Sequence, residues 1–379
     1  MLQKIRFFFL ILTCFWGCIP KKDALLVDKE MVLRLRWASA YSNEKWEEVQ
    51  TGLEWGLSLL GAELPKGCMK KALIAKENKI YELNFNELGF SETAKNALLP
   101  LLFTLKKSEE YQQKGGIDMG RFLVFTLHHS WHYYAITNVP RTFAQFEKTH
   151  RTPTESQFSL LHSSVSNGNR LISFQENVSP TEMAFVAKEV HEAKVSHKTE
   201  TAGFEAFDIM KNGQLRFIIY DEKGKLAESS PVTLSKAGKP GKCMWCHESK
   251  ILPLFVPSLD AEGSMSVAEF EEKMKKMNTQ LGEYQLGQNT EIDWKNTQAH
   301  TRQEWLYIGF MEPNVRRIAA EWGMSEAQTL AKIQHLPTHR HEEFDFFGDC
   351  YHRKDIDVLA PFGVVKVPES VREGETVSR

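Results

Sequence analysis

The sequence predicts an α+β fold: a helical N-terminal part, a β-rich middle with hairpins, and a mainly helical C-terminal part. Three observations support this order. Apolar residues recur at helical spacing before residue 150 and after residue 265. Between residues 155 and 235, two Asn-Gly pairs separate β-prone stretches, which is a hairpin signal. The composition, 42% hydrophobic and 25% charged, is that of a soluble globular protein.

Length and charge narrow the class of protein further. At about 100–200 residues per domain, a chain of 379 residues allows two domains, or three. No run of about 18 apolar residues is present, which excludes a protein that spans the membrane several times. The formal net charge is −2, which gives no support to nucleic-acid binding.

Residues 1–17 are predicted to form an export signal. Lys4 and Arg6 precede an apolar segment that is too short to span a bilayer as a helix. The segment ends with a small residue directly before Cys18, and this ending resembles the lipobox of bacterial lipoproteins. The resemblance implies that a signal peptidase cuts before Cys18. A diacylglycerol on the Cys18 sulfur would then hold a soluble body at the membrane.

The match to a lipobox is imperfect, because Phe15 and Trp16 are bulkier than the usual residues at those places. Cys14 is a second candidate for the modified cysteine, and a plain secretory signal is the alternative interpretation. Each interpretation places the rest of the chain outside the cytoplasm. With the lipid, the location is the periplasmic side of a bacterial membrane or the cell surface.

Residues 18–150 are predicted to form a mainly helical region. Leucines and other apolar residues predict helix across residues 24–60. Lys79–Phe85 suggests a short strand. Ser91 is placed to cap a helix that runs to Lys107.

Residues 151–240 are predicted to be β-rich. The first hairpin joins Gln157–His162 to Arg170–Phe174, and the second joins Phe204–Met210 to Leu215–Tyr220. Val232–Leu234 is a candidate for one more strand. The Asn-Gly pairs at 167–168 and 212–213 supply the residues that tight hairpin turns favour.

Residues 241–365 return to helical spacing, and residues 366–379 are expected to be a frayed polar tail. The helices predicted in this part are Ser266–Leu281, Ala299–Phe310, Pro313–Trp322 and a segment capped by Ser325 that ends at Gln334.

The motif that indicates chemistry is Cys-Met-Trp-Cys-His at residues 243–247. This spacing resembles the covalent haem attachment site of c-type cytochromes. The resemblance implies that the thiols of Cys243 and Cys246 form thioethers with the two haem vinyl groups. It also implies that His247 is the axial ligand of the haem iron. One motif predicts one covalent haem c, bound by the region 241–365, and the export signal places the chain where haem c is attached.

Other uses of a Cys-x-x-Cys pair fit less well. A thioredoxin-like site places the pair at the start of a helix in a βαβ unit, whereas this pair follows predicted hairpins and a Gly/Pro/Lys-rich loop. A structural zinc site needs four ligands, commonly two such pairs, and the sequence has one. We therefore expect haem c.

The sixth position on the iron is left open by the sequence. Met311, 64 residues after His247 in a Pro-containing segment, is one candidate for the distal ligand. Met265, Met274 and Met277 are further methionines, although the last two fit a helical core. Histidine is equally plausible, with candidates in the two groups His128, His129, His132 and His335, His339, His341. An open position is the third possibility.

Two cysteines remain once lipid and haem are assigned. In an oxidising compartment, Cys68 and Cys350 suggest one disulfide between the N-terminal and C-terminal parts. Two buried free thiols are the alternative.

Three further patterns have ordinary structural explanations. Residues 317–333 have the spacing of a helix-turn-helix, but an exported acidic chain has no DNA to contact. The group at 128–132 is more typical of aromatic packing than of a metal site. The run from His339 to Glu343 is more typical of a solvated loop than of a divalent-metal site.

Together, motif and signal predict an exported, lipid-anchored, monohaem c-type cytochrome-like protein that transfers electrons at a membrane surface. Its partner would be a redox protein or a small-molecule oxidant or reductant. The alternative is a haem c enzyme, or a gas or redox sensor, with an open iron site for peroxide, oxygen or nitric oxide. In a third hypothesis the motif is accidental and the chain is a binding lipoprotein. About 220 residues of the mature chain precede the motif and have no assigned role.

Overall fold

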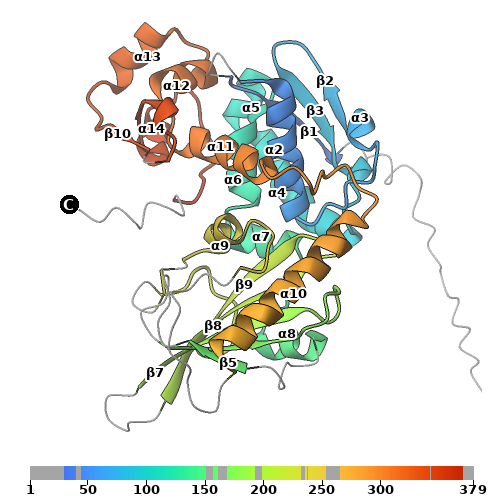
Figure 1. Ribbon diagram of the computed structural model, residues 1–379. Helices are drawn as coiled ribbons and strands as arrows, with labels where there is room; N and C mark the ends of the chain where they lie inside the picture. The colour runs from blue at the N-terminus through green and yellow to red at the C-terminus, as the bar shows by residue number, and fades with distance from the viewer. Residues whose placement is uncertain are drawn as a thin grey trace, which may run out of the picture.

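The computed structural model describes residues 30–39, 44–150, 157–160, 169–192, 199–231, 235–236, 238–252, 265–341 and 343–369 (Figure 1). Helices and mainly antiparallel strands occupy separate stretches of the chain, which confirms the predicted α+β class. The predicted signal at 1–17, Cys14, Cys18, the candidate strand Val232–Leu234 and residues 370–379 lie outside the described residues.

The N-terminal part combines a small sheet with several helices. The sheet has the strand order β2-β3-β1-β4, formed by β1 (Val32–Arg36), β2 (Leu73–Ala75), β3 (Ile80–Asn84) and β4 (Ile117–Asp118). The helices are α2 (Trp46–Leu59), α3 (Met69–Ala72), η1 (Phe85–Glu87), α4 (Glu92–Lys107), α5 (Glu109–Lys114), α6 (Met119–Thr126), α7 (Ser130–Ile136) and α8 (Phe143–His150).

Strand β1 corrects the helix predicted across residues 24–60. Leu33 and Leu35 are fully buried and alternate with arginines, which is the period of a strand and not of a helix. β1 pairs antiparallel with β3, so that Leu33 faces Leu83 across the ladder. The helix begins only at Trp46. The strand predicted near 79–85 is confirmed, and so is the helix capped by Ser91, whose side chain accepts a hydrogen bond from the Ala94 amide.

The middle of the chain forms a five-stranded antiparallel sheet in sequence order. Its strands are β5 (Gln157–Leu160), β6 (Asn169–Phe174), β7 (Ala184–Glu192), β8 (Thr199–Ile209) and β9 (Leu215–Asp221). Both predicted strand pairs, β5–β6 and β8–β9, are confirmed. In the second turn Gly213 has a φ of +88°, a conformation that favours glycine.

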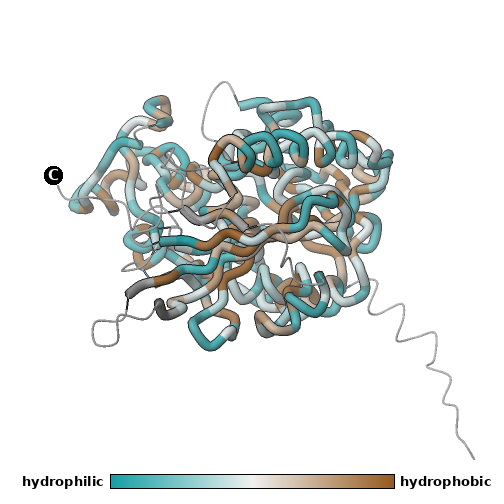
Figure 2. Tube along the Cα trace, turned by 60° about the horizontal axis from the view of Figure 1, so that its bottom comes forward, coloured by the Kyte–Doolittle hydropathy of each residue, from teal (hydrophilic) through white to brown (hydrophobic). Residues whose placement is uncertain are grey.

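Helices cover both faces of this sheet. On one face, Phe143 of α8 stacks on Phe204 of β8 with ring centroids 4.0 Å apart. On the other face, Phe270 of α10 (Val267–Leu286) lies 5.7 Å from Phe174 of β6. Figure 1 shows α10 crossing in front of the strands, with the short helix α9 (Pro240–His247) near one end of the sheet. Figure 2 shows hydrophobic residues concentrated where the strands meet the helices.

The C-terminal part returns to helices, as predicted. It contains α11 (Ala299–Met311), α12 (Val315–Trp322), α13 (Glu326–Ile333), β10 (His339–Arg340), η2 (Asp345–Phe347), β11 (Asp349–Cys350) and α14 (Arg353–Leu359). Ser325 caps α13 through a complete capping box. Helix α11 packs closely on α2: a Cβ on Gly52 would lie 2.6 Å from the carbonyl oxygen of Arg302, so this crossing requires glycine.

A buried ion network fixes the C-terminal helices to the N-terminal part. The guanidinium of Arg121 in α6 is fully buried and contacts the carboxylates of Glu110, Glu321 and Asp357 at 2.8–3.2 Å. Arg353 of α14 pairs with Glu321 at 2.9 Å. Within the described part of the chain, no helix has both the length and the apolar character needed to cross a membrane.

Candidate haem c attachment site

The Cys-x-x-Cys-His residues lie on α9, which begins with Pro240 and ends at His247. Successive helical residues are about 100° apart around the axis, so Cys243, Cys246 and His247 share one face and Trp245 lies on the opposite face. The contacts agree with this division. His247 lies against the five-stranded sheet, whereas Trp245 lies against Tyr307 of α11.

Neither motif cysteine is in a disulfide, and the two thiols lie on the same helix face. Cys243 is partly buried, with its Sγ 3.8 Å from the carbonyl oxygen of Lys239, and Cys246 is exposed. Burial raises the pKa of the Cys243 thiol, and the Glu205 carboxylate raises it further. The two sulfurs are therefore presented from consecutive turns of one helix, the arrangement that attachment to two vinyl groups needs.

His247 has one ring nitrogen engaged. Its Nδ1 lies 3.4 Å from the carbonyl oxygen of Lys250. A carbonyl oxygen only accepts, so Nδ1 must carry the proton and Nε2 keeps its lone pair. Burial lowers the pKa of His247 to about 4, which keeps the ring neutral at pH 7. A neutral imidazole whose second nitrogen donates to a carbonyl is the usual state of a metal-binding histidine.

The segment that supplies this carbonyl, residues 248–252, is held in an unusual conformation. Glu248 and Ser249 both adopt left-handed backbone geometry, with φ of 45° and 58°. Such geometry is uncommon in residues other than glycine, and it turns the chain sharply at the end of α9. The turn brings the Lys250 carbonyl back to the His247 ring.

Three amide side chains hold the 248–252 segment. The Asn278 side chain accepts from the Ile251 amide at 2.7 Å and donates to the Ile251 carbonyl. The Gln285 side chain donates to the Ser249 carbonyl at 3.1 Å. The hydroxyl of Ser249 bonds to Gln214, which is fully buried. The position of the Lys250 carbonyl is thus fixed from both sides.

The ring of His247 packs at the end of a row of four phenylalanines that crosses the sheet. Phe174, Phe185, Phe207 and Phe217 are register partners on β6 to β9, with neighbouring ring centroids 4.5–5.7 Å apart. His247 lies 5.4 Å from Phe207 and 5.3 Å from Phe217. The sheet therefore gives this face of α9 an apolar, aromatic support.

Trp245 belongs to a separate buried cluster. Its ring lies 4.5 Å from Tyr307 and 5.5 Å from His128, and Nε2 of His128 lies 3.2 Å from the Gln303 amide nitrogen. Burial lowers the pKa of His128 to about 3, so this ring is neutral at physiological pH. Met311 is buried in the same hydrophobic cluster as Trp245.

Met311, one candidate for the distal ligand, belongs to the same buried hydrophobic cluster as Trp245. Trp245 lies on the face of α9 opposite to His247. Met274 and Met277 are buried in the main core, as expected, and Met265 is partly buried against it. The structure brings none of these methionines into a described contact with His247.

The cysteines expected to form a disulfide are not joined. Cys68, at the start of α3, and Cys350, on β11, are free and buried in two different hydrophobic clusters. Burial raises the pKa of Cys68 to about 11 and that of Cys350 to about 12. The structure therefore corresponds to the alternative of two buried thiols, each shielded by its own core.

The two histidine groups have structural contacts. His132 bonds through Nδ1 to the Phe125 carbonyl at 2.7 Å and stacks on His129. His339 pairs with Glu312 at 2.9 Å. Within the described ranges, no group of three or more His, Cys, Asp or Glu residues is placed to bind a metal ion.

One charged pair beside the motif was not predicted from the sequence. Arg170 of β6 pairs with Glu205 of β8 at 2.8 Å, and Glu205 also accepts from Ser230 at 2.6 Å. The charges of this pair act on the pKa of both Cys243 and His247. No local signal could have indicated this, because two strands 35 residues apart supply the pair.

Comparison with protein-family models, with curated proteins and with solved structures finds no match to this chain. The evidence for the candidate site therefore comes from its residues and their geometry alone.

Proposed function

We propose that this chain is an exported, lipid-anchored protein that carries one covalent haem c and transfers electrons at a membrane surface. The observation that carries the proposal is the state of His247. This ring is neutral, its Nδ1 donates to the Lys250 carbonyl, and its Nε2 keeps its lone pair on the same helix face as the thiols of Cys243 and Cys246.

The residues around the motif have distinct roles in this proposal. Cys243 and Cys246 would hold the group on α9, and His247 Nε2 would bind its iron. The Lys250 carbonyl orients the imidazole and makes it a stronger donor. When bound, the haem supplies a one-electron ferric/ferrous couple. The phenylalanine row against His247 would exclude water from that side of the imidazole. This would favour a constant reduction potential of the haem iron.

An enzyme or a gas sensor with an open iron site is the second candidate. The surroundings of Met311 favour it, because this methionine shares the buried cluster of Trp245, whose side chain lies on the face of α9 opposite to His247. If Met311 does not bind the iron, histidines are the remaining protein candidates for the distal position. The two candidates differ in spin state, since electron transfer favours a six-coordinate low-spin iron and ligand chemistry favours an open one.

The test is an optical spectrum of the full chain, produced in a host that matures haem c and released from the membrane. A peptide of residues 243–247 with the added mass of haem, and a low-spin spectrum unchanged by carbon monoxide, would support electron transfer. A high-spin spectrum that shifts with carbon monoxide would favour the enzyme or sensor. A peptide without haem would contradict both the electron-transfer protein and the enzyme or sensor. The remaining hypothesis would be a binding lipoprotein with an accidental motif.

Matched variants separate attachment from folding. Cys243→Ala with Cys246→Ala should abolish covalent haem, and Cys350→Ala, which removes a thiol elsewhere, should not. His247→Ala should leave haem unligated or poorly attached, whereas His352→Ala, at a half-buried histidine outside the candidate ligands, serves as its control. Cys18→Ala should move the protein from the detergent phase to the aqueous phase if lipid is attached there. Unchanged partition would contradict the lipid anchor but not the haem.

A further inference from the structure

Buried side chains join the segment that orients His247 to helix α2 of the N-terminal part. The hydroxyl of Ser249, two residues after His247, donates to the side-chain oxygen of Gln214. The side-chain nitrogen of Gln214 donates to the hydroxyl of Ser58, in the last turn of α2, at 2.7 Å. Ser58 in turn donates to the Trp55 carbonyl at 2.7 Å. A continuous row of hydrogen bonds therefore runs from the end of the motif into α2.

Each hydrogen bond in this row has only one possible direction. The Trp55 carbonyl can only accept, so the Ser58 proton points to it and the Ser58 oxygen accepts from Gln214. The side-chain oxygen of Gln214 is then left to accept from Ser249. Ser58 and Gln214 are fully buried, and Ser249 is 3% exposed. Because a buried polar group without a partner is costly, a change at Ser58 should be transmitted to Ser249.

A second buried amide holds the β8–β9 turn on the end of α2. The Asn212 side-chain nitrogen donates to the carbonyls of Ser58 and Ala62 at 2.7 and 2.8 Å. Its side-chain oxygen accepts from the backbone amide of Gln214 at 3.1 Å. The last carbonyls of a helix lack partners within the helix, and Asn212 satisfies one of them. The position of Gln214 is therefore fixed by the end of α2.

Helix α10 approaches the same place from another direction. The Gln285 side-chain nitrogen donates to the carbonyls of Gly213 and Ser249 at 2.9 and 3.1 Å. The packing is close, since a Cβ on Gly213 would lie 3.0 Å from Cγ of Gln285. Four segments that are distant in the sequence thus meet through buried polar side chains. We call this group the polar junction, and its members are Ser58, Asn212, Gln214, Ser249 and Gln285.

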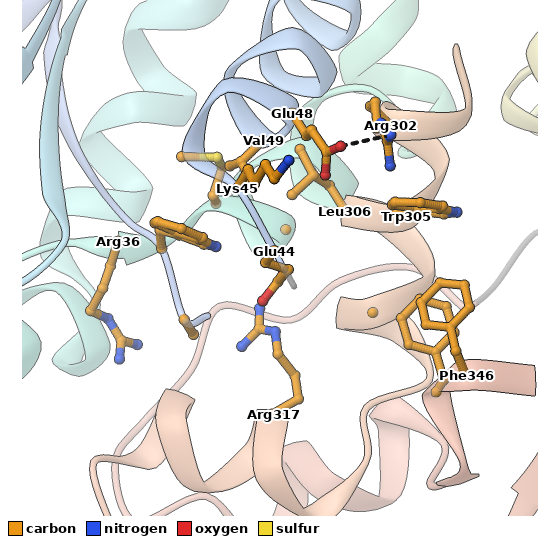
Figure 3. A pocket seen from close by; sticks show the side chains of 16 residues that line it. Arg36, Glu44, Lys45, Glu48, Val49, Arg302, Trp305, Leu306, Arg317 and Phe346 are labelled. Carbon is orange, nitrogen blue, oxygen red and sulfur yellow. Dashed lines mark ion pairs between the residues drawn. The ribbon is translucent and has the colours of Figure 1, made fainter. Parts of the chain in front are cut away.

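The first turns of α2 are fixed as well, so this helix is a rigid support for the polar junction. Figure 3, drawn around a pocket of about 520 Å³ at the start of α2, shows Glu48 paired with Arg302 of α11 at 2.8 Å. At Gly52 the backbones of α2 and α11 are in direct contact, with 2.6 Å between a Cβ placed there and the Arg302 carbonyl oxygen. A displacement of α2 would therefore disturb α11 too.

We propose that Ser58, Asn212 and Gln214 are positioning residues for His247. Acting through Ser249, they hold the Lys250 carbonyl against Nδ1 and so leave Nε2 of the ring to bind iron. The inference rests on the proposed function, and it gives part of the chain before the motif a role in setting the state of the axial ligand. A merely structural junction would stabilise the fold without changing which ring nitrogen carries the proton.

Nitrogen NMR of the haem-free full chain, made in a host that does not mature haem c, tests the proposal. With labelled histidine at pH 7, the spectrum shows which ring nitrogen is protonated, and His247→Phe identifies the signals of His247. We expect wild type to show the Nδ1-protonated form. Gln214→Met keeps a long side chain but removes the amide. We expect it to raise the fraction of the Nε2-protonated form by about 5-fold or more, the change in population that one typical hydrogen bond produces.

Ser58→Ala is a smaller change and covers the case in which Gln214→Met does not fold. Its control is Thr329→Val, which removes a fully buried hydroxyl that donates to the Ser325 carbonyl at 3.0 Å in α13. Both variants should lose stability in denaturant titrations, but only Ser58→Ala should change the protonated nitrogen of His247. If Gln214→Met and Ser58→Ala both leave it unchanged, the polar junction is only structural and the proposal is wrong.

A double-mutant cycle tests the path from α2 to the motif. If the effect of Ser58 passes through Ser249, Ser58→Ala combined with Ser249→Ala should give the same ratio of the two His247 forms as Ser249→Ala alone. Independent, additive effects would contradict the path through Gln214.

The haem-loaded chain supplies a second measurement. Ser58→Ala should raise the midpoint potential, because a less firmly oriented imidazole is a weaker donor to the iron, and Thr329→Val should not. A chain that never acquires haem would contradict the proposed function. The NMR result on the haem-free chain would still decide whether the polar junction positions His247.

Discussion

Nδ1 of His247 lies 3.4 Å from the carbonyl oxygen of Lys250, three residues further along the chain. This contact determines which nitrogen of the ring stays available. The contact also depends on Asn278, which lies 28 residues after Lys250. Its side chain forms hydrogen bonds with both the amide and the carbonyl of Ile251. The orientation of the His247 ring in the five-residue motif thus depends on a helix that follows it in the chain.

Asn278→Ala should release the Lys250 carbonyl from its position. Two hydrogen bonds to Ile251 are lost, so we expect the free energy of unfolding to fall by about 1–3 kcal/mol. In the haem-loaded protein the imidazole becomes a weaker donor, which should raise the midpoint potential. Potentiometric titration measures the second effect. Asn296→Ala, which removes a side-chain bond to the Gln298 amide, is the control and should leave the potential unchanged.

Acid should destabilise the haem-free protein through His247. Its pKa is about 4 when folded, against about 6.5 when unfolded. Between these values the unfolded chain binds more protons, so stability falls as the pH is lowered from 6.5 to 4. Denaturant titrations of wild type and His247→Phe across this window should show a shallower pH slope in the variant. His128 contributes a similar slope of its own, so identical slopes in wild type and His247→Phe would argue against a buried neutral His247.

Arg121 should be far more important for stability than an arginine in an exposed pair. Arg121→Met removes the buried cation that Glu110, Glu321 and Asp357 share, and although Glu110 keeps Arg36 and Glu321 keeps Arg353, we expect a cost of about 3–5 kcal/mol. Arg340→Met breaks an exposed pair with Asp349 and should cost less than about 1 kcal/mol. Chemical denaturation compares the two. A small effect of Arg121→Met would mean that water or a rearranged side chain compensates these carboxylates.

Alkylation should distinguish the cysteines of the haem-free protein. In the folded chain at pH 8 we expect iodoacetamide to modify the exposed Cys246 and to spare Cys68 and Cys350, whose thiols are buried and have raised pKa values. Denaturant without reductant should then make both available. Peptide mass spectrometry reads the result, and continued protection after denaturation would instead indicate the disulfide that the sequence suggested.

Local patterns predicted the elements whose signals lie within a few residues. Ser91 and Ser325 cap the helices that were expected, and the Asn-Gly pair at 212–213 joins β8 to β9. These predictions succeed because caps and tight turns satisfy their own backbone groups. β1 was missed because Leu33 and Leu35 lie beside further leucines that also fit a helical spacing, and only pairing with β3 makes the strand.

The role expected of Met311 and the Cys68–Cys350 bridge show the limit of such patterns. Spacing along the chain suggested that Met311 could reach the iron, yet α11 places it in the buried cluster of Trp245. An oxidising compartment and two cysteines left over after lipid and haem suggested a disulfide between Cys68 and Cys350. The two cysteines instead lie in separate hydrophobic clusters. Which residues meet across the core depends on packing between distant segments, and neither spacing nor composition encodes that.

From the sequence alone we predicted the α+β class, the longest helices, two strand pairs of the central sheet, and a motif whose residue types and spacing indicate haem c. The tertiary structure alone decided the surroundings of that motif. It placed His247 on the phenylalanine row and bound its Nδ1 to the Lys250 carbonyl through a segment held by Asn278. Backbone signals act over a few residues, whereas the environment of a side chain is set by long-range packing.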